Sequence, residues 1–143
     1  MRSTVFVIMP VGSDPRFGER RSAIESAISA CGMDTLFPFE DGSHAEFDLA
    51  VMLTKLRSSA AVVADLTLER PSCYFEVGVA QTVHPTVVLI AEQGTTIHQV
   101  GGAEAVSFYK SIDELTEHLT RKLHASGIGA ARRPAKKRPS VAA

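Results

Sequence analysis

Residues 60–91 have the sequence AAVVADLTLERPSCYFEVGVAQTVHPTVVLIA. Short apolar runs, Ala60–Asp65 and Thr86–Ala91, stand at its two ends, and such runs are typical of strands that are buried on both faces. Pro71 suits the first position of a helix because that position needs no backbone N–H, and this helix would end near Val83. We therefore predict a strand–helix–strand unit, which in proteins makes a right-handed crossover between parallel strands.

The alternation of strand and helix patterns continues on both sides of this unit. Three more strands are expected at Thr4–Met9, Met33–Phe39 and Val106–Tyr109, and a helix is expected from Glu19 to Gly32. Two further helices are indicated by periodic apolar residues: Leu49, Met52, Leu53 and Leu56 in one, and Ile112, Leu115, Leu119 and Leu123 in the other. Strands separated by helices of this length predict an α/β fold. We expect a flavodoxin-like or Rossmann-like three-layer sandwich with a mainly parallel, five-stranded sheet.

The charge is distributed unevenly along the chain. The 143 residues carry a formal net charge of −1, but the segment 127–143 holds five Lys and Arg residues and no acid, which leaves 10 basic and 16 acidic residues elsewhere. We predict one α/β domain over residues 1–126 and a basic, disordered tail over 127–143. The tail could bind RNA or DNA through its charge, although five cations without aromatic residues favour a solubilising extension.

Several classes of protein do not fit the composition. No apolar run reaches the 18 or so residues of a membrane span, and the apolar start is too short for a signal peptide. Cys31 and Cys73 form neither a disulfide framework nor a CxxC pair. The five histidines lack metal-ligand spacing, so we expect no metal and no cofactor. The sequence predicts a cytoplasmic protein with no membrane contact.

Ligands of parallel α/β sheets bind beyond the carboxyl ends of the strands. This rule selects three segments: Pro10–Gly18, Phe39–Glu46 and Asp65–Glu76. Glu76 is expected in the first turns of the third helix, where a carboxylate gains from the helix dipole, and Gly78 leaves room for another backbone or a ligand beside that helix. Alternatively, Glu76 only stabilises the helix start and Gly78 only packs.

The segment after the first strand is a second candidate. Its backbone N–H groups could hold a phosphate, helped by Ser13 and Arg16, although the arginines here could equally be solvated charges at a helix start. The segment matches neither common phosphate-loop motif. The candidate substrate-binding residues in it are Pro10, Gly12, Ser13, Arg16, Phe17 and Gly18.

Four segments of the chain resemble the nucleoside 2-deoxyribosyltransferase superfamily. They are VFVIMP at 5–10, ADLT at 64–67, PSCYFEVGVA at 71–80 and TVVLI at 86–90. That superfamily includes nucleoside 5′-monophosphate N-glycosidases and TIR-like proteins, and the similarity extends from about Thr4 to about Leu123 in the family's motif order.

The resemblance implies cleavage of an N-glycosidic bond. The family's catalytic glutamate aligns with Glu76, which would attack C1′ of the sugar, displace the base and hold the sugar as an ester. By the same resemblance, Ser72 joins the candidates for binding a 5′-phosphate. Relatives complete their sites across subunits, so a homodimer or higher homo-oligomer is expected.

The sequence departs from the family at two acids. Transferases carry an aspartate six residues before the glutamate, where this chain has Arg70, and another in the preceding helix, where it has Met52. Asp48 lies one turn upstream of Met52 and could replace the second aspartate, or it could be only an acid of the helix's first turn. Asp65 could serve instead, or cap the turn after its strand.

These departures favour hydrolysis over base exchange. We therefore expect an N-glycosidase that acts on a nucleotide, with Arg70 among its substrate-binding residues. Two alternatives stay open: a TIR-like hydrolase that cleaves NAD, and a non-catalytic module that binds nucleotides.

Overall fold

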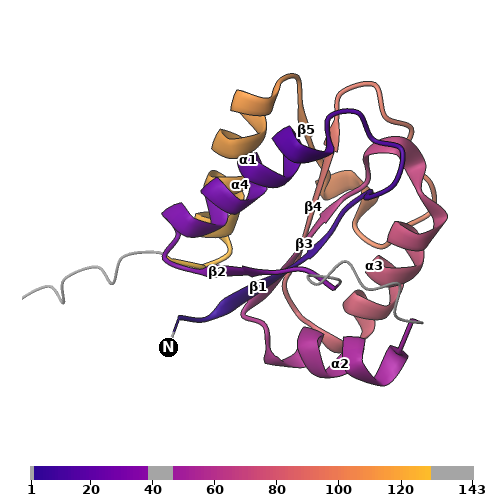
Figure 1. The fold of residues 1–143 in the computed structure, drawn as a ribbon, viewed down its shortest axis with the longest axis vertical. Helices are drawn as coiled ribbons and strands as arrows, with labels where there is room; N and C mark the ends of the chain where they lie inside the picture. The colour runs from indigo at the N-terminus through magenta and orange to yellow at the C-terminus, as the bar shows by residue number, and fades with distance from the viewer. Residues whose placement is uncertain (1, 39–46, 130–143) are drawn as a thin grey trace, which may run out of the picture.

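In a computed structural model, the chain is described for residues 2–38 and 47–129. Five strands form one sheet in the order β2-β1-β3-β4-β5, and every neighbouring pair is parallel (Figure 1). The strands are β1 (Thr4–Ile8), β2 (Asp34–Leu36), β3 (Ala61–Asp65), β4 (Val87–Glu92) and β5 (Ser107–Tyr109). The predicted α/β class is confirmed, and the sheet is wholly rather than mainly parallel.

Two pairs of helices cover the two faces of the sheet (Figure 1). One face carries α1 (Phe17–Ala30) and α4 (Ile112–Ala125), and the other carries α2 (Leu49–Ser58) and α3 (Pro71–Val83). Because successive side chains of a strand point to opposite faces, each central strand contributes to two cores. Val5 and Val7 pack under α1 and α4, whereas Phe6 and Ile8 pack under α2 and α3. The result is the predicted three-layer sandwich.

Most observed bounds lie within one residue of the expected ones, and two elements differ by more. The second strand covers only Asp34–Leu36. The first helix begins at Phe17 rather than Glu19, and Phe17 packs against the core under α1 and α4.

The strand order places the candidate residues at one edge of the sheet. From β1 the chain passes to β2 on one side and then crosses to β3 on the other, so the carboxyl ends of β1 and β3 form the switch point of the topology. The β1–α1 and β3–α3 connections both start there. The expected segment Phe39–Glu46 lies outside the described residues.

The last described residues pack at the opposite, amino edge of the sheet. Ile128 lies against the core under α1 and α4. Gly129 adopts a left-handed conformation with φ of 64°, and a Cβ atom there would stand 2.1 Å from the carbonyl oxygen of Cys31. Only glycine fits this contact. Residues 130–143, most of the basic tail, lie outside the described residues.

Across residues 2–38 and 47–129, no helix combines the length and the apolar character needed to cross a bilayer.

Candidate active site

Glu76 lies in the second turn of α3, near the carboxyl edge of the sheet. Pro71 occupies the first helical position, Arg70 is the N-cap, and no side chain caps this helix. Glu76 is partly buried, and burial raises the pKa of its carboxyl to about 7. Among the described residues no side chain hydrogen-bonds or forms an ion pair with it. A carboxyl that is partly ionised near neutral pH can act as nucleophile, acid or base.

The two connections at the switch point contain strained backbone. Ser13 in the β1–α1 connection has φ of 59°, and Leu68 and Glu69 in the β3–α3 connection have φ of 67° and 52°. Side chains other than glycine rarely adopt such values, which cost about 1–3 kcal/mol each and persist only where other contacts fix them. Strain of this kind concentrates at functional sites.

Arg70 joins these two connections. Its Nη2 atom donates a hydrogen bond of 2.7 Å to the carbonyl oxygen of Gly12. This contact brings Gly12 and Ser13 next to the start of α3, where Ser72 is exposed. Four of the sequence-predicted binding residues therefore lie together at the switch point: Gly12, Ser13, Arg70 and Ser72.

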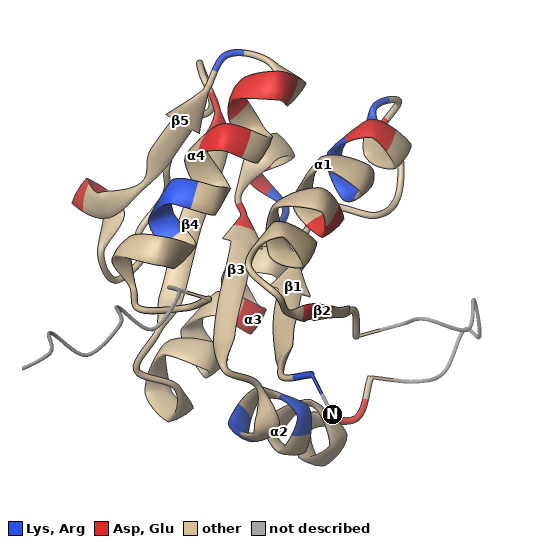
Figure 2. Cartoon of the chain, turned by 90° about the vertical axis from the view of Figure 1, so that its left-hand side faces the viewer, with Lys and Arg blue, Asp and Glu red and all other residues tan. Residues whose placement is uncertain are grey.

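The other predicted binding residues of the β1–α1 segment do not join this group. Arg16 lies 3.4 Å from carboxylate oxygens of both Glu19 and Glu92, so the structure does not support its expected role as an anion ligand. Pro10 is buried, and Phe17 packs against the core under α1 and α4. In α1 the basic residues Arg20 and Arg21 are adjacent and lie between the acidic residues Glu19 and Glu25, and Figure 2 shows both charge colours along this helix.

The three glycines among the candidate residues have free space around them. Gly12, Gly18 and Gly78 are exposed, and a Cβ atom at any of them would meet no described atom within 4 Å. Gly78 therefore does not pack against a described neighbour and leaves free space beside α3; because it lies two residues from Glu76, this open side does not face the Glu76 side chain.

Asp48 is the N-cap of α2. One of its carboxylate oxygens accepts hydrogen bonds from the backbone N–H groups of Ala50 at 2.9 Å and Val51 at 3.2 Å. The neighbouring Phe47 contacts Phe75, with ring centroids 5.7 Å apart. Asp48 thus lies at the end of α2 that faces α3, but its carboxylate is engaged in helix capping.

Asp65 does not face α3. In β3 the side chains of Ala61, Val63 and Asp65 point towards α1 and α4, whereas Val62 and Ala64 point towards α2 and α3. The Asp65 side chain has no exposed surface. The expectation that Asp65 contacts the substrate therefore disagrees with the structure: its side chain lies on the α1 and α4 side of the sheet, and only its direct neighbours, Ala64 and Leu66, point to the other face.

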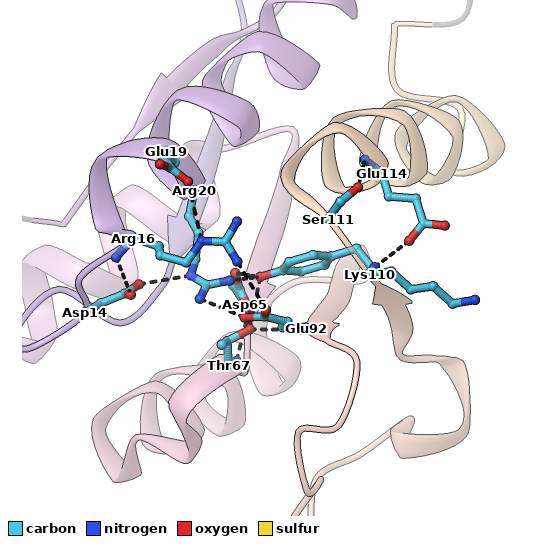
Figure 3. Close-up of polar contacts among 11 residues, drawn as sticks. Asp14, Arg16, Glu19, Arg20, Asp65, Thr67, Glu92, Lys110, Ser111 and Glu114 are labelled. Carbon is cyan, nitrogen blue, oxygen red and sulfur yellow. Dashed lines mark hydrogen bonds and ion pairs between the residues drawn. The ribbon is translucent and has the colours of Figure 1, made fainter.

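Asp65 instead belongs to a buried polar network that the sequence analysis missed (Figure 3). Its carboxylate accepts hydrogen bonds from the Thr67 N–H at 3.0 Å, the Thr67 hydroxyl at 2.5 Å and the Tyr109 hydroxyl at 2.7 Å. Burial raises the pKa of Asp65, although these bonds act in the opposite direction. Burial and the nearby Asp65 likewise raise the pKa of Tyr109.

Arg20 extends this network into α1. Its guanidinium contacts Asp14 at 3.0 Å, the Tyr109 hydroxyl at 3.0 Å and Glu92 at 2.8 Å. Burial disfavours the charged guanidinium and lowers the pKa of Arg20, but these partners outweigh it and hold that pKa above its ordinary value. One sequence signal could have identified Arg20, because it shares the buried stripe of α1 with Ile24, Ala27 and Ile28.

Two further kinds of chemistry near Glu76 would need a cysteine thiolate or a metal-binding cluster of side chains. Cys73 is 3% exposed, and burial together with the nearby Glu76 and Asp65 raises the pKa of its thiol to about 12, so the thiol stays protonated. The described residues contain no cluster of three or more His, Cys, Asp or Glu side chains that could hold a metal ion.

No protein-family model and no curated protein sequence matches the chain. Among solved structures, it is similar to a 2-deoxyribosyltransferase from Bacillus psychrosaccharolyticus, with a TM-score of 0.57 and 11% identity over 80% of this chain and 90% of that chain. It is equally similar to a diflavin flavoprotein A3 from Nostoc sp., with a TM-score of 0.56 and 11% identity over 90% of this chain and 92% of that chain. The chain therefore shares a flavodoxin-like, three-layer fold with both proteins, and at this identity the similarity is one of fold alone.

Proposed function

We propose that the protein is an N-glycosidase that hydrolyses a ribo- or deoxyribonucleoside 5′-monophosphate to the free base and the sugar 5-phosphate. The observation that carries this proposal is Glu76, a partly buried carboxyl without a side-chain partner among the described residues. It stands in an E-x-G-x-A sequence at the edge of the sheet where this fold class binds ligands.

Glu76 acts as the nucleophile in this proposal. Its ionised carboxylate attacks C1′, the C1′–N bond breaks, and the base leaves with the bonding electrons and takes up a proton. Water then attacks C1′ of the glycosyl ester, the C1′–O bond to Glu76 breaks, and the water gives up one proton, which balances the proton taken up by the base. This step releases the sugar phosphate and restores the Glu76 carboxylate. The intermediate divides one difficult substitution into two easier steps.

The phosphate is held at the switch point by Ser13, Arg70 and Ser72. Arg70 supplies the positive charge, and the start of α3 supplies the favourable end of a helix dipole with no side-chain cap. Local donors of this kind are needed, since the chain outside the basic tail carries 10 basic and 16 acidic residues and its overall field repels an anion.

We also propose that the protein forms a homodimer through α2 and α3. Large apolar side chains are exposed there, with 47% of Phe47, 45% of Leu49, 49% of Val51 and 53% of Phe75 accessible. Exposed apolar side chains in this number support a contact surface, and it adjoins the helix that carries Glu76. Sedimentation of the wild type and of Phe75→Ser tests this: the wild type should sediment as a dimer and the variant as a monomer.

The activity is tested by incubating the protein with nucleoside monophosphates, free nucleosides and NAD, and by separating the released bases chromatographically. Base release from a monophosphate but not from its nucleoside supports the proposal. Release of nicotinamide alone would instead indicate a TIR-like NAD hydrolase, and binding without release would indicate a non-catalytic module. Glu76→Gln, which keeps the size of the side chain, is the control and should release no base.

A further inference from the structure

Two connections at the carboxyl edge, and the end of β4, are anchored to the same buried network. Asp14 of the β1–α1 connection binds the Arg20 side chain and also accepts from the Arg16 N–H at 2.9 Å. Thr67 begins the β3–α3 connection, and the N–H of Glu92, the last residue of β4, donates to the Thr67 hydroxyl at 2.9 Å. Figure 3 shows these side chains converging on Asp65.

The hydroxyl protons of this network have a defined direction. The Tyr109 hydroxyl oxygen accepts from Arg20, so its proton is free to be donated to Asp65. The Thr67 hydroxyl oxygen accepts from the Glu92 N–H, so its proton is likewise donated to Asp65. The two hydroxyl oxygens lie 3.0 Å apart, side by side on their common acceptor. The network therefore fixes the place of Thr67 from several directions at once.

Thr67 is also the first residue of the turn that leads to α3. The turn spans Thr67–Glu69, contains the left-handed Leu68 and Glu69, and ends at Arg70, the N-cap of the helix. Strained residues hold their conformation only where the surrounding structure fixes it. The bonds to Thr67 supply that constraint at the entrance of the turn.

We propose that Tyr109, Asp65 and Thr67 are positioning residues for Glu76. They hold the strained turn and thereby set the place of Arg70 and of the first two turns of α3. None of the three is more than 3% exposed, so they act through the backbone and do not touch the substrate. This inference rests on the proposed function only for its kinetic consequence.

The experiment compares variants that remove one hydroxyl each. Thr67→Val and Tyr109→Phe keep the packing but lose a bond to Asp65, and each should lower kcat by about 10- to 100-fold while KM changes by less than about 3-fold, because Glu76 is displaced from its line of attack. Thr67→Ser keeps the hydroxyl and should restore most of kcat. Thr116→Val is the matched control, since within residues 2–38 and 47–129 its hydroxyl bonds only the carbonyl oxygens of Ala23 in α1 and Ile112 in α4; it should leave kcat unchanged.

Hydrogen exchange separates positioning from a general loss of stability. In Thr67→Val and Tyr109→Phe, the amides of residues 66–72 should lose protection, while those of α4 keep theirs. Unchanged exchange at 66–72, or an unchanged kcat per folded molecule, would overturn the positioning role. If Tyr109→Phe does not fold, Thr67→Val and Thr67→Ser still decide the question.

The exchange measurement also keeps the two proposals distinguishable. If the wild type releases no base, the N-glycosidase proposal fails, but the loss of protection at residues 66–72 still tests whether the network holds the turn. If the wild type is active and the exchange is unchanged, only the positioning role fails.

Discussion

The ionisation of Glu76 couples function to stability. Its pKa is about 7 in the folded chain against an ordinary value of 4.5, so below pH 4.5 or so the carboxyl is protonated in both the folded and the unfolded state. Between these two pH values the Glu76 carboxyl is mostly ionised in the unfolded chain but mostly protonated in the folded chain. The free energy of unfolding therefore falls as the pH rises through this window and stays lower above it.

Glu76→Gln removes this penalty. At about pH 8 the variant should be more stable than the wild type by about 1–2 kcal/mol, a value reduced from the full shift because the side chain is only partly buried. At about pH 4 the two proteins should unfold at the same urea concentration. A variant that is less stable at the higher pH would contradict the desolvation of Glu76. In the active wild type, kcat/KM should rise with pH through a limb near 7, as the nucleophile ionises.

The pair formed by Arg20 and Asp14 should be essential for stability. Their side chains are 3% and 1% exposed, and Arg20→Leu leaves a buried carboxylate without its partner. The expected loss in the free energy of unfolding is about 3–5 kcal/mol, measured by urea denaturation. Arg121→Leu is the control: its pair with Glu117 is 66% and 71% exposed, and its loss should lie below about 1 kcal/mol.

At the residue scale, the sequence identified Glu76 more readily than the residues around it. The position of Glu76 follows from a helix that starts at Pro71 and from the edge rule for parallel sheets. The alternation of side chains in β3 places Asp65 on the other face from Val62 and Ala64, and this alternation can be read from the sequence alone. Two of the three partners of Arg20 could not be identified in this way, because Tyr109 and Glu92 are more than 70 residues away along the chain.

At the scale of elements, helix α2 offers a test of Asp48. If Asp48 only caps the helix, then Asp48→Ser, which also caps well, should keep both the stability and the activity. Asp48→Ala should lose about 1 kcal/mol of stability with little change in kcat. If Asp48 instead acts as the acid, both variants lose activity alike. Thermal denaturation and base release, measured on the same samples, distinguish these outcomes.

The order and type of the elements could be predicted because the buried strands are continuous apolar runs and the helices carry periodic stripes. The β3–α3 turn could not be predicted in the same way. In a sequence, a position with positive φ is usually indicated by glycine or asparagine, whereas in this chain Leu68 and Glu69 occupy such positions. Their conformation depends on contacts with β4 and β5 that a local pattern does not contain.

At the scale of the whole molecule, the basic tail and the rest of the chain should be separable. A chain that ends at Gly129 loses five basic residues, and its formal net charge changes from −1 to −6. Ser13, Arg70 and Ser72 are unaffected, so kcat/KM should stay within about 2-fold of the full chain at physiological salt, where distant charges are screened. Binding to a polyanion such as heparin should weaken. A large fall in kcat/KM would show that the tail takes part in substrate binding.

The contact between Gly129 and Cys31 has a practical consequence for attaching the protein to a solid support or a carrier. It holds the end of the described chain at the amino edge of the sheet, about 16 Å from the carboxyl edge, since a strand rises about 3.3 Å per residue over five residues. A bead, electrode or fused carrier joined directly at Gly129, in place of residues 130–143, would lie at the amino edge of the sheet. The carboxyl edge, near which Glu76 lies, would then point away from the support and stay accessible to dissolved nucleotides.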